Sequence, residues 1–145
     1  MPQDRVLLVS CSKSKRACNN KYKAEDLYNS ALFKKSRLYA QSNFSHWYIL
    51  SAKHGLLSPG NLIKPYNLTL NDMTVTERKA WSASVSLDIF KSCTPETEFD
   101  ILAGNSYTKY LVPLLCERGY TVRLPLKGLG IGQRLAWLNN RILHE

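Results

Sequence analysis

The segment R-V-L-L-V-S-C-S-K-S-K, from Arg5 to Lys15, decides how this chain folds. Val6 to Val9 form a continuous apolar run, which is typical of a strand buried on both faces of a parallel sheet. The run ends at Ser10, where short polar residues and lysines begin. Because ligands of open α/β folds bind outside the carboxyl ends of the strands, this strand end is a candidate site for an anion. An ordinary solvated loop would contain the same residues, so the other strand ends have to be considered with it.

The composition predicts a globular protein with a basic surface. The chain of 145 residues is 44% hydrophobic and 21% charged, which suits a single α/β domain, expected to span residues 1–145. We see neither a signal peptide nor an apolar run of about 18 residues, so we expect a cytoplasmic location. The four cysteines form no zinc-like pattern, and we expect free thiols and neither a metal nor a cofactor. The formal charge of +9 favours a partner that carries phosphates, although many small basic proteins bind no nucleic acid.

Apolar runs alternate with helical patterns along the chain, which predicts right-handed βαβ units and one parallel sheet. Strands are expected at residues 5–10, 47–51, 99–103 and 120–124. Three of the helices are expected to follow the N-cap residues Ser30, Thr74 and Ser106. Two long loops are expected, at residues 15–28 and 56–72.

Polar side chains follow all four expected strands. Because parallel strands end at the same edge of a sheet, these side chains should meet there and form one site. The set consists of Ser12, Lys13, Lys15, Lys53, His54, Asn105, Ser106, Tyr107 and Lys127. A further segment leads into the last helix, where glycines either let the backbone approach an anion or form a tight turn; its glycines are Gly128, Gly130 and Gly132.

Several of these residues suit acid–base chemistry or base recognition, and each also has a structural interpretation. His54 can transfer a proton or donate to a leaving group. Asn105 can bind a base edge or position a water, and it can equally cap a helix. Asp26 is one of the loop carboxylates nearest the strand ends. Aromatic side chains can stack on a base, although they are more often part of a core; the candidates are Tyr28, Tyr66 and Tyr107.

Six short motifs occur in order along nearly the whole chain. They are Cys11-Ser12-Lys13-x-Lys15, Leu27-Tyr28-x-Ser30, Leu50-Ser51-Ala52-Lys53-x-Gly55-Leu56, Pro65-Tyr66, Ala103-Gly104 and Pro125-Leu126-x-Gly128-Leu129-x-Ile131-Gly132. Together they resemble a small family of phage and bacterial proteins, which is similar to a remote branch of the uracil-DNA glycosylase superfamily. The first strand end is also similar to that of archaeosine synthases, which act on a modified base in RNA.

The resemblance implies a three-layer α/β/α fold with a four-stranded parallel sheet in the order 2-1-3-4. It also implies a DNA glycosylase of anti-phage defence, which excises a modified base such as α-glucosyl-5-hydroxymethylcytosine from phage DNA and leaves abasic sites. The uracil-excising enzymes carry Asp or Asn after the first strand and a late His-Pro-Ser segment. Here the corresponding segments are Ser12-Lys13 and Pro125-Leu126-Lys127, so catalytic roles do not transfer by motif.

The resulting hypothesis is hydrolysis of an N-glycosidic bond in double-stranded or locally opened phage DNA. The target base leaves the stack and enters a pocket at the strand ends. His54 or Lys127 would stabilise the departing base, and Asn105 or a loop aspartate such as Asp26 would orient water. We therefore expect Asn105→Ala and His54→Ala to lower base release far more than DNA binding.

Three alternatives remain open. The first is an enzyme that acts on a free nucleotide or on a modified RNA base, and the second is a nucleic-acid-binding or nucleotide-binding module without catalysis. The third changes only the mechanism: the amine of Lys13 or Lys53 would attack the sugar and form a Schiff base. That route would allow borohydride to trap a covalent protein–DNA adduct.

We predict that the affinity of the protein for DNA falls steeply with salt, because Lys13 and Lys15 displace counterions from flanking phosphates. Substitution of both lysines by alanine should weaken binding across sequences and flatten the dependence of log K on log salt concentration. Titrations of labelled duplexes at several salt concentrations measure both effects. No binding even at low salt would favour the free-nucleotide hypothesis instead.

Overall fold

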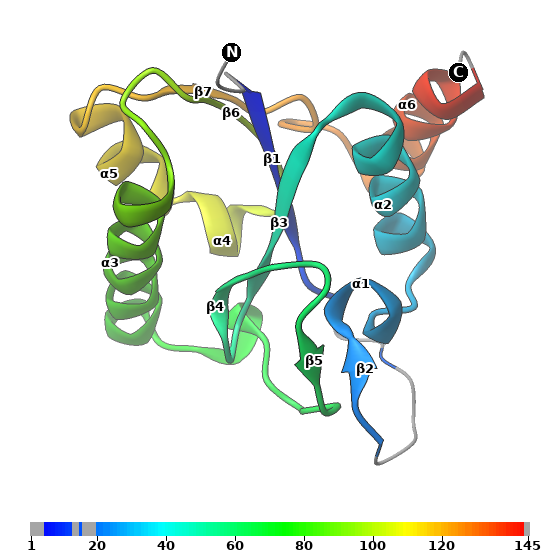
Figure 1. The fold of residues 1–145 in the computed structure, drawn as a ribbon, viewed down its shortest axis with the longest axis horizontal. Coiled ribbons are helices and arrows are strands. Elements are labelled where there is room, and N and C mark those ends of the chain that lie inside the picture. The colour runs from blue at the N-terminus through cyan, green and yellow to red at the C-terminus, as the bar shows by residue number, and fades with distance from the viewer. Residues whose placement is uncertain (1–4, 13–14, 16–19, 144–145) are drawn as a thin grey trace.

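The computed structural model describes residues 5–12, 15 and 20–143, so the predicted site residue Lys13 lies outside the described part. The main sheet has five strands in the order β4-β3-β1-β6-β7 (Figure 1). The strands are β1 (Arg5–Ser10), β3 (His46–Ser51), β4 (Gly55–Leu57), β6 (Glu98–Leu102) and β7 (Thr121–Arg123). β3, β1, β6 and β7 are parallel, which confirms the predicted strands and their relative order.

The prediction of a purely parallel, four-stranded sheet is wrong, because β4 adds an antiparallel edge strand beside β3. The chain reverses directly after Ser51, and Ser51 pairs with Gly55 in the register of the two strands. Gly55 has a φ of 71°, a left-handed conformation that glycine adopts without strain and that closes short hairpins. The expected loop at residues 56–72 therefore begins inside a strand.

Described parts of the two expected long loops pair with each other. β2 (Tyr22–Lys23) pairs antiparallel with β5 (Leu62–Ile63), and an isolated bridge joins Lys15 to Tyr28. A short helix, α1 (Ala24–Leu27), follows β2 directly. Two-residue strands have too little periodicity to be recognised in a sequence, which explains why residues 15–28 and 56–72 resemble plain loops.

Helices cover both faces of the main sheet (Figure 1). On one side α3 (Val75–Ser92) packs against α5 (Leu111–Glu117), and on the other α2 (Ala31–Asn43) packs against α6 (Ile131–Leu143). Two shorter elements complete the fold, η1 (Leu70–Asp72) before α3 and α4 (Asn105–Thr108) before α5. No helix in the described part of the chain is long and apolar enough to span a membrane.

Local signals determine where the long helices begin. Ser30 Oγ accepts a hydrogen bond from the backbone N of Phe33 at 3.0 Å, which confirms Ser30 as the N-cap of α2. Thr74 and Glu77 form the predicted capping box at the start of α3, with 3.1 Å from Glu77 N to Thr74 Oγ1 and 2.8 Å from Thr74 N to Glu77 Oε1. At the end of α5, Gly119 has a φ of 102°, a conformation that commonly ends helices.

The prediction of Ser106 as an N-cap is wrong. α4 already begins at Asn105, and Gly104 occupies the cap position. The Ser106 hydroxyl instead donates to Asn71 Oδ1, which η1 brings alongside α4. A long-range partner has therefore replaced the local one that the sequence suggested.

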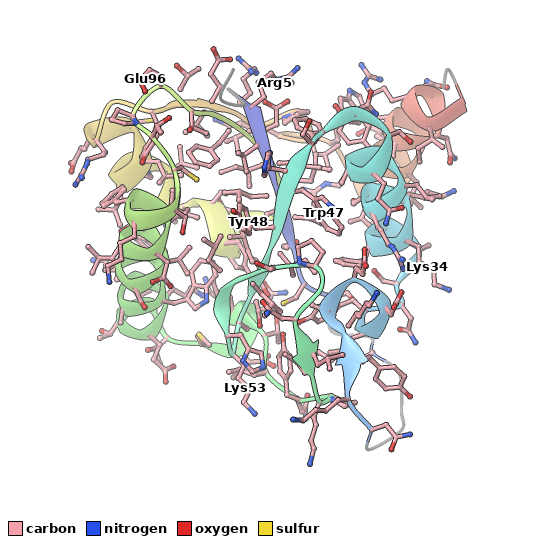
Figure 2. All side chains as sticks on the ribbon, in the orientation of Figure 1. Arg5, Lys34, Trp47, Tyr48, Lys53 and Glu96 are labelled. Atoms are coloured by element: carbon pink, nitrogen blue, oxygen red, sulfur yellow. The ribbon has the colours of Figure 1, made fainter. Side chains whose placement is uncertain are left out.

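β1 is the centre of the hydrophobic core. Its residues Val6 to Val9 are at most 2% exposed, as expected for a strand covered on both faces. Trp47 and Tyr48 lie on opposite sides of the neighbouring strand β3 (Figure 2), as consecutive strand residues do. The buried carboxylate of Asp100 accepts hydrogen bonds from Arg5 at 2.8 Å and from Arg123 at 3.1 Å. These ion pairs connect β1, β6 and β7 through their side chains.

We predict that Thr74→Ala lowers the free energy of unfolding by about 1 kcal/mol, because it removes the cap of α3. The matched control is Thr76→Ala, which changes an exposed threonine just after the cap and should alter stability by less than about 0.5 kcal/mol. Urea denaturation of the two variants and the parent chain measures the difference. Equal losses in both variants would show that the capping box contributes nothing specific.

Candidate functional site at the carboxyl ends of the parallel strands

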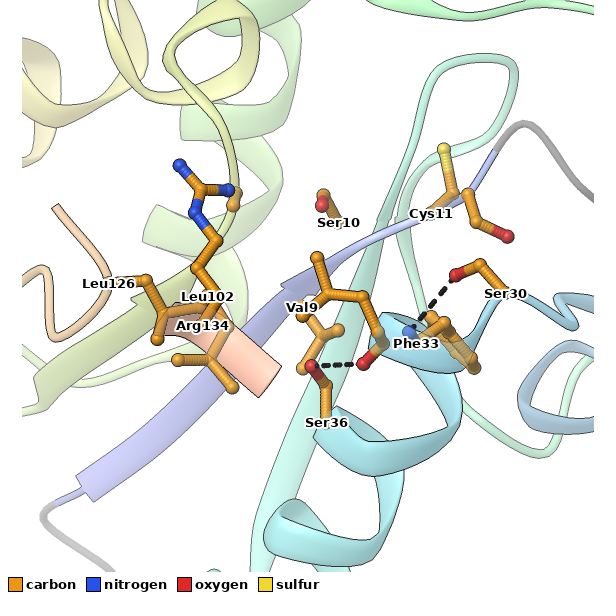
Figure 3. Close-up of a pocket in the computed structure, with 12 residues that line it drawn as sticks. Val9, Ser10, Cys11, Ser30, Phe33, Ser36, Leu102, Leu126 and Arg134 are labelled. Atoms are coloured by element: carbon orange, nitrogen blue, oxygen red, sulfur yellow. Dashed lines mark hydrogen bonds between the residues drawn. The ribbon is translucent and has the colours of Figure 1, made fainter. Parts of the chain in front are cut away.

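The main sheet has a topological switch point between β1 and β6. From β1 the chain continues through α2 to β3 on one side, whereas β6 is followed by β7 on the other. Ligands of open α/β sheets bind in the crevice outside the carboxyl ends of two such strands. A cavity of about 150 Å³ opens there, which we call the switch-point cavity (Figure 3). It is lined by Val9, Ser10, Cys11, Ser12, Ser30, Leu32, Phe33, Ser36, Leu102, Ala103, Leu126 and Arg134.

A second cavity lies next to the first, on the face of the sheet that α5 covers, and we call it the outer cavity. Its volume of about 290 Å³ is close to the lower limit of about 300 Å³ for ligand pockets. The structure thus brings together Asn105, Lys127 and Gly128, three of the predicted site residues, from two different strand ends. The full lining is Ile101, Ala103, Asn105, Thr108, Lys109, Val112, Pro113, Leu124, Lys127, Gly128 and Arg134.

Arg134 connects the two cavities, because it lines both of them together with Ala103. It lies in the first turn of α6, and its Nε donates to the carbonyl oxygen of Leu129 at 2.9 Å. This bond fixes the plane of the guanidinium, whose terminal nitrogens have no hydrogen-bond partner among the described residues. No carboxylate of the described residues lines either cavity, and Lys109 and Lys127 add positive charge to the outer one. Both cavities therefore favour anionic groups.

A separate group of predicted residues gathers around Tyr66, near the end of β3. Tyr66 Oη lies 2.6 Å from Tyr28 Oη and 2.8 Å from Ser51 Oγ, and in each pair either hydroxyl can donate. Ser51 Oγ also accepts from the backbone N of His54 at 3.0 Å. The Ser51 carbonyl accepts from the indole of Trp81 at 2.9 Å. These bonds hold the two long connecting segments against the carboxyl end of β3.

Basic side chains surround the ring of Tyr66. Lys15 Nζ lies 4.5 Å and Lys53 Nζ 5.9 Å from the ring centroid, and the His54 ring meets it edge-on with 5.5 Å between centroids. Burial and the nearby ammonium of Lys53 lower the pKa of His54, so its imidazole is neutral at pH 7. We call these four residues, with Tyr28 and Ser51, the Tyr66 cluster. It presents positive charge beside the strand ends and lines neither cavity.

Cys11 lies near the phenols of Tyr28, Tyr66 and Tyr107, of which Tyr28 and Tyr107 are buried and Tyr66 is half-buried. Its Sγ is 3.2 Å from Tyr107 Oη, and the residue is 8% exposed. Burial, with a smaller contribution from the negative charge of a Cys11 thiolate, raises the pKa of Tyr28 to about 12. The same two causes raise the pKa values of Tyr66 and Tyr107 well above their usual range. All three phenols therefore keep their protons at neutral pH and act as uncharged hydrogen-bond donors.

The remaining predicted residues lie at several places. Ser12 lines the switch-point cavity, and of the three glycines only Gly128 has a positive φ, of 81°. The backbone N of Gly130 donates to the side chain of Gln133 at 2.9 Å, and Gly132 is part of α6. Asp26 lies in α1 rather than in a loop, forms an ion pair with Arg37 at 2.7 Å and lines neither cavity.

Sequence reasoning missed Lys109 and Arg134. Both lie beyond the strand ends, Lys109 just after α4 and Arg134 in the first turn of α6. Polar residues early in the helices that follow parallel strands would have indicated them, because those helices start at the same edge of the sheet. Within the described residues, no three His, Cys, Asp or Glu side chains gather as they would around a metal ion.

Fold and cavities define a mixed α/β protein with two adjoining cavities at the carboxyl ends of its parallel strands. The chain belongs to the family of unknown function DUF6884, whose sequence model matches residues 6–140. It is also 30% identical over 150 residues to the "Uncharacterized protein YfjM" of Bacillus subtilis (strain 168), a match that covers 95% of each chain. Neither description states an activity, so the resemblance to the uracil-DNA glycosylase superfamily remains a prediction.

We predict that the free energy of unfolding falls as the pH rises above about 10, because the unfolded chain then releases phenolic protons that the folded chain retains. For Tyr28 this loss extends to about pH 12, its folded-state value. In Tyr28→Phe the free energy of unfolding should therefore fall less steeply with pH between about pH 9 and about pH 11. The number of protons released on unfolding should be smaller by about one, and urea unfolding at several pH values measures it.

The internal control for this prediction is the range from about pH 6 to about pH 8, where phenols are protonated in both states and the two proteins should respond in parallel. Identical slopes above pH 10 would mean that the Tyr28 phenol ionises as readily in the fold as in the unfolded chain. That result would contradict its burial against Tyr66.

Proposed function

We propose that this chain is a DNA N-glycosylase with a three-layer α/β/α fold of the uracil-DNA glycosylase type. The observation that carries the proposal is the pair of adjoining cavities at the carboxyl ends of β1, β6 and β7, with Asn105 and Lys127 in the outer one. Enzymes that act on a base in DNA extrude the nucleotide into a pocket. The outer cavity is the proposed pocket for the extruded base.

The proposed reaction is hydrolysis of the bond between C1′ of the sugar and the base nitrogen. The oxygen of a water molecule adds to C1′ while that bond breaks, and the bonding electron pair leaves with the base. One proton of the water ends on the departing base, and the other stays on the new hydroxyl group. Asn105 orients the water, and the ammonium of Lys127 stabilises the negative charge that develops on the base.

The Tyr66 cluster is the proposed contact to the DNA backbone. Lys15 and Lys53 hold their ammonium groups over the Tyr66 ring, beside the strand ends rather than inside a cavity. Contacts to phosphates on both sides of the extruded nucleotide fix the register of a protein on DNA. The placement of His54 in this cluster suits backbone binding better than the catalytic role suggested by its sequence position.

The proposed substrate is phage DNA that carries a modified cytosine, with α-glucosyl-5-hydroxymethylcytosine as the first candidate. The support for this choice is the motif resemblance, together with the basic charge of the chain. Base removal would leave abasic sites that disable the phage genome, which places the enzyme in anti-phage defence. Such an enzyme would act in the cytoplasm, where the injected DNA is exposed.

We predict that the protein forms abasic sites in glucosylated phage DNA and that Asn105→Ala lowers the rate by about a hundredfold or more with little change in DNA affinity. His54→Ala should show the opposite pattern, with weaker binding and a smaller effect on the single-turnover rate. An aldehyde-reactive probe measures base release. The matched control is Asn140→Ala, which changes an exposed asparagine on α6.

Unmodified DNA of the same sequence serves as the substrate control. No abasic sites in either DNA would contradict the glycosylase proposal, and full activity of Asn105→Ala would remove that residue from the mechanism. Borohydride present during turnover tests the route through a lysine amine. A trapped adduct that disappears in Lys13→Ala, Lys53→Ala, Lys109→Ala or Lys127→Ala would replace hydrolysis by Schiff-base chemistry.

A further inference from the structure

The switch-point cavity contains hydrogen-bond donors that the proposed base release does not use. Figure 3 shows Arg134 on one side of this cavity and Ser30 on the other, with Val9 and Ser10 of β1 between them. Ser12, two residues beyond the end of β1, adds another hydroxyl group to the lining. The remaining lining is mostly apolar, so the polar groups are few and converge from three elements of the fold.

Arg134 gives this cavity a positive charge that no carboxylate in its described lining balances. Among the described residues its guanidinium has one hydrogen bond, from Nε to the carbonyl oxygen of Leu129, and none of their carboxylates lines the cavity. A guanidinium held in one plane presents its remaining N–H groups as a fork, which matches two oxygens of a phosphate. A half-buried cation without a counter-charge is more stable with an anion beside it.

The size and position of the cavity limit what that anion can be. Its volume of about 150 Å³ is about half the lower limit of about 300 Å³ for ligand pockets, too little for a whole nucleotide. Ala103 and Arg134 form a common wall with the outer cavity, the proposed pocket for the base. The small volume and the shared wall both fit a small anionic group that is covalently attached to the ligand of the outer cavity.

We propose that the switch-point cavity is a phosphate subsite, in which Arg134 binds the phosphate of the same nucleotide whose base enters the outer cavity. The proposal rests on the proposed function, since it takes a nucleotide as the ligand. Ser10 and Ser30 donate to the remaining phosphate oxygens. Ser30 retains this ability while it caps α2, because its oxygen accepts from Phe33 and its hydroxyl proton is still available.

The phosphate can belong to DNA, as a diester, or to a free nucleotide, as a monoester. The test is calorimetric titration of the full chain with deoxycytidine, deoxycytidine 5′-monophosphate and the methyl ester of that monophosphate. We expect at least one of the two phosphorylated probes to bind about tenfold or more tightly than deoxycytidine, the effect of one charge-assisted contact. A gain with the methyl ester assigns the subsite to DNA, and a gain with the monophosphate alone assigns it to free nucleotides.

Two variants test whether the gain comes from this cavity. Because Arg134 also lines the outer cavity, the gain is taken within each protein as the ratio of its affinities for a phosphorylated probe and for deoxycytidine. Arg134→Gln should reduce this ratio to less than about twofold, whereas Arg134→Lys should keep part of it because a point charge remains. Ser10→Val fills the cavity from the β1 side without touching Arg134 and should also abolish the gain. If Arg134→Gln does not fold, the Ser10→Val result decides. The matched control is Arg141→Gln, an exposed arginine of the same helix that stacks on Trp137.

Absence of a gain with both phosphorylated probes would overturn the proposal, as would an equal gain in the parent chain, Arg134→Gln and Ser10→Val. Base release from DNA is scored separately. Base release without an Arg134-dependent gain overturns the subsite and retains the glycosylase. An Arg134-dependent gain without base release retains the subsite and overturns the glycosylase.

Discussion

β1 is hydrogen-bonded to β3 along one edge and to β6 along the other, and helices cover both of its faces. Its apolar residues are essentially inaccessible to water, so truncation of Leu7 or Leu8 to alanine would be expected to cost about 2–5 kcal/mol. That is a large share of the roughly 5–15 kcal/mol that stabilises a domain. The ladder continues past the strand, because Cys11 N still donates to Leu50 O at 2.9 Å. The burial of β1 therefore also fixes where the polar residues after Val9 lie.

The position of the candidate site follows from this constraint. Because β3 and β6 both pair with β1 but are reached in opposite directions along the sheet, the crevice between β1 and β6 is open at the carboxyl end. α2 and α6 lie on one side of it and α5 on the other, so one cavity forms on each face. Arg134 lies where the cavities meet. The Tyr66 cluster is built on the same edge from β3 and the long connecting segments, which gives the site a second cationic region.

Much of this arrangement could be predicted from the sequence, because burial and capping are local signals. The apolar run of β1, the cap at Ser30 and the capping box at Thr74 identify their elements directly. β4 was not predictable in the same way, since its pairing depends on a left-handed glycine at Gly55 and on a partner strand rather than on periodicity. The same holds for Arg134, whose place between the two cavities depends on where α6 packs. Polar strand ends predicted that a site exists, but not that His54 and Asn105 belong to different parts of it.

The central claim is that a modified nucleotide binds at the carboxyl ends of the parallel strands, between β1, β6 and α6. Amide chemical-shift mapping of the labelled protein, titrated with an oligonucleotide that carries α-glucosyl-5-hydroxymethylcytosine, tests this most directly. The account predicts that the largest shifts occur at Ser10, Ala103, Asn105 and Arg134, while Arg5 and Glu98 at the opposite strand ends stay unchanged. Shifts concentrated at those opposite ends, or no saturable shifts at all, would contradict it.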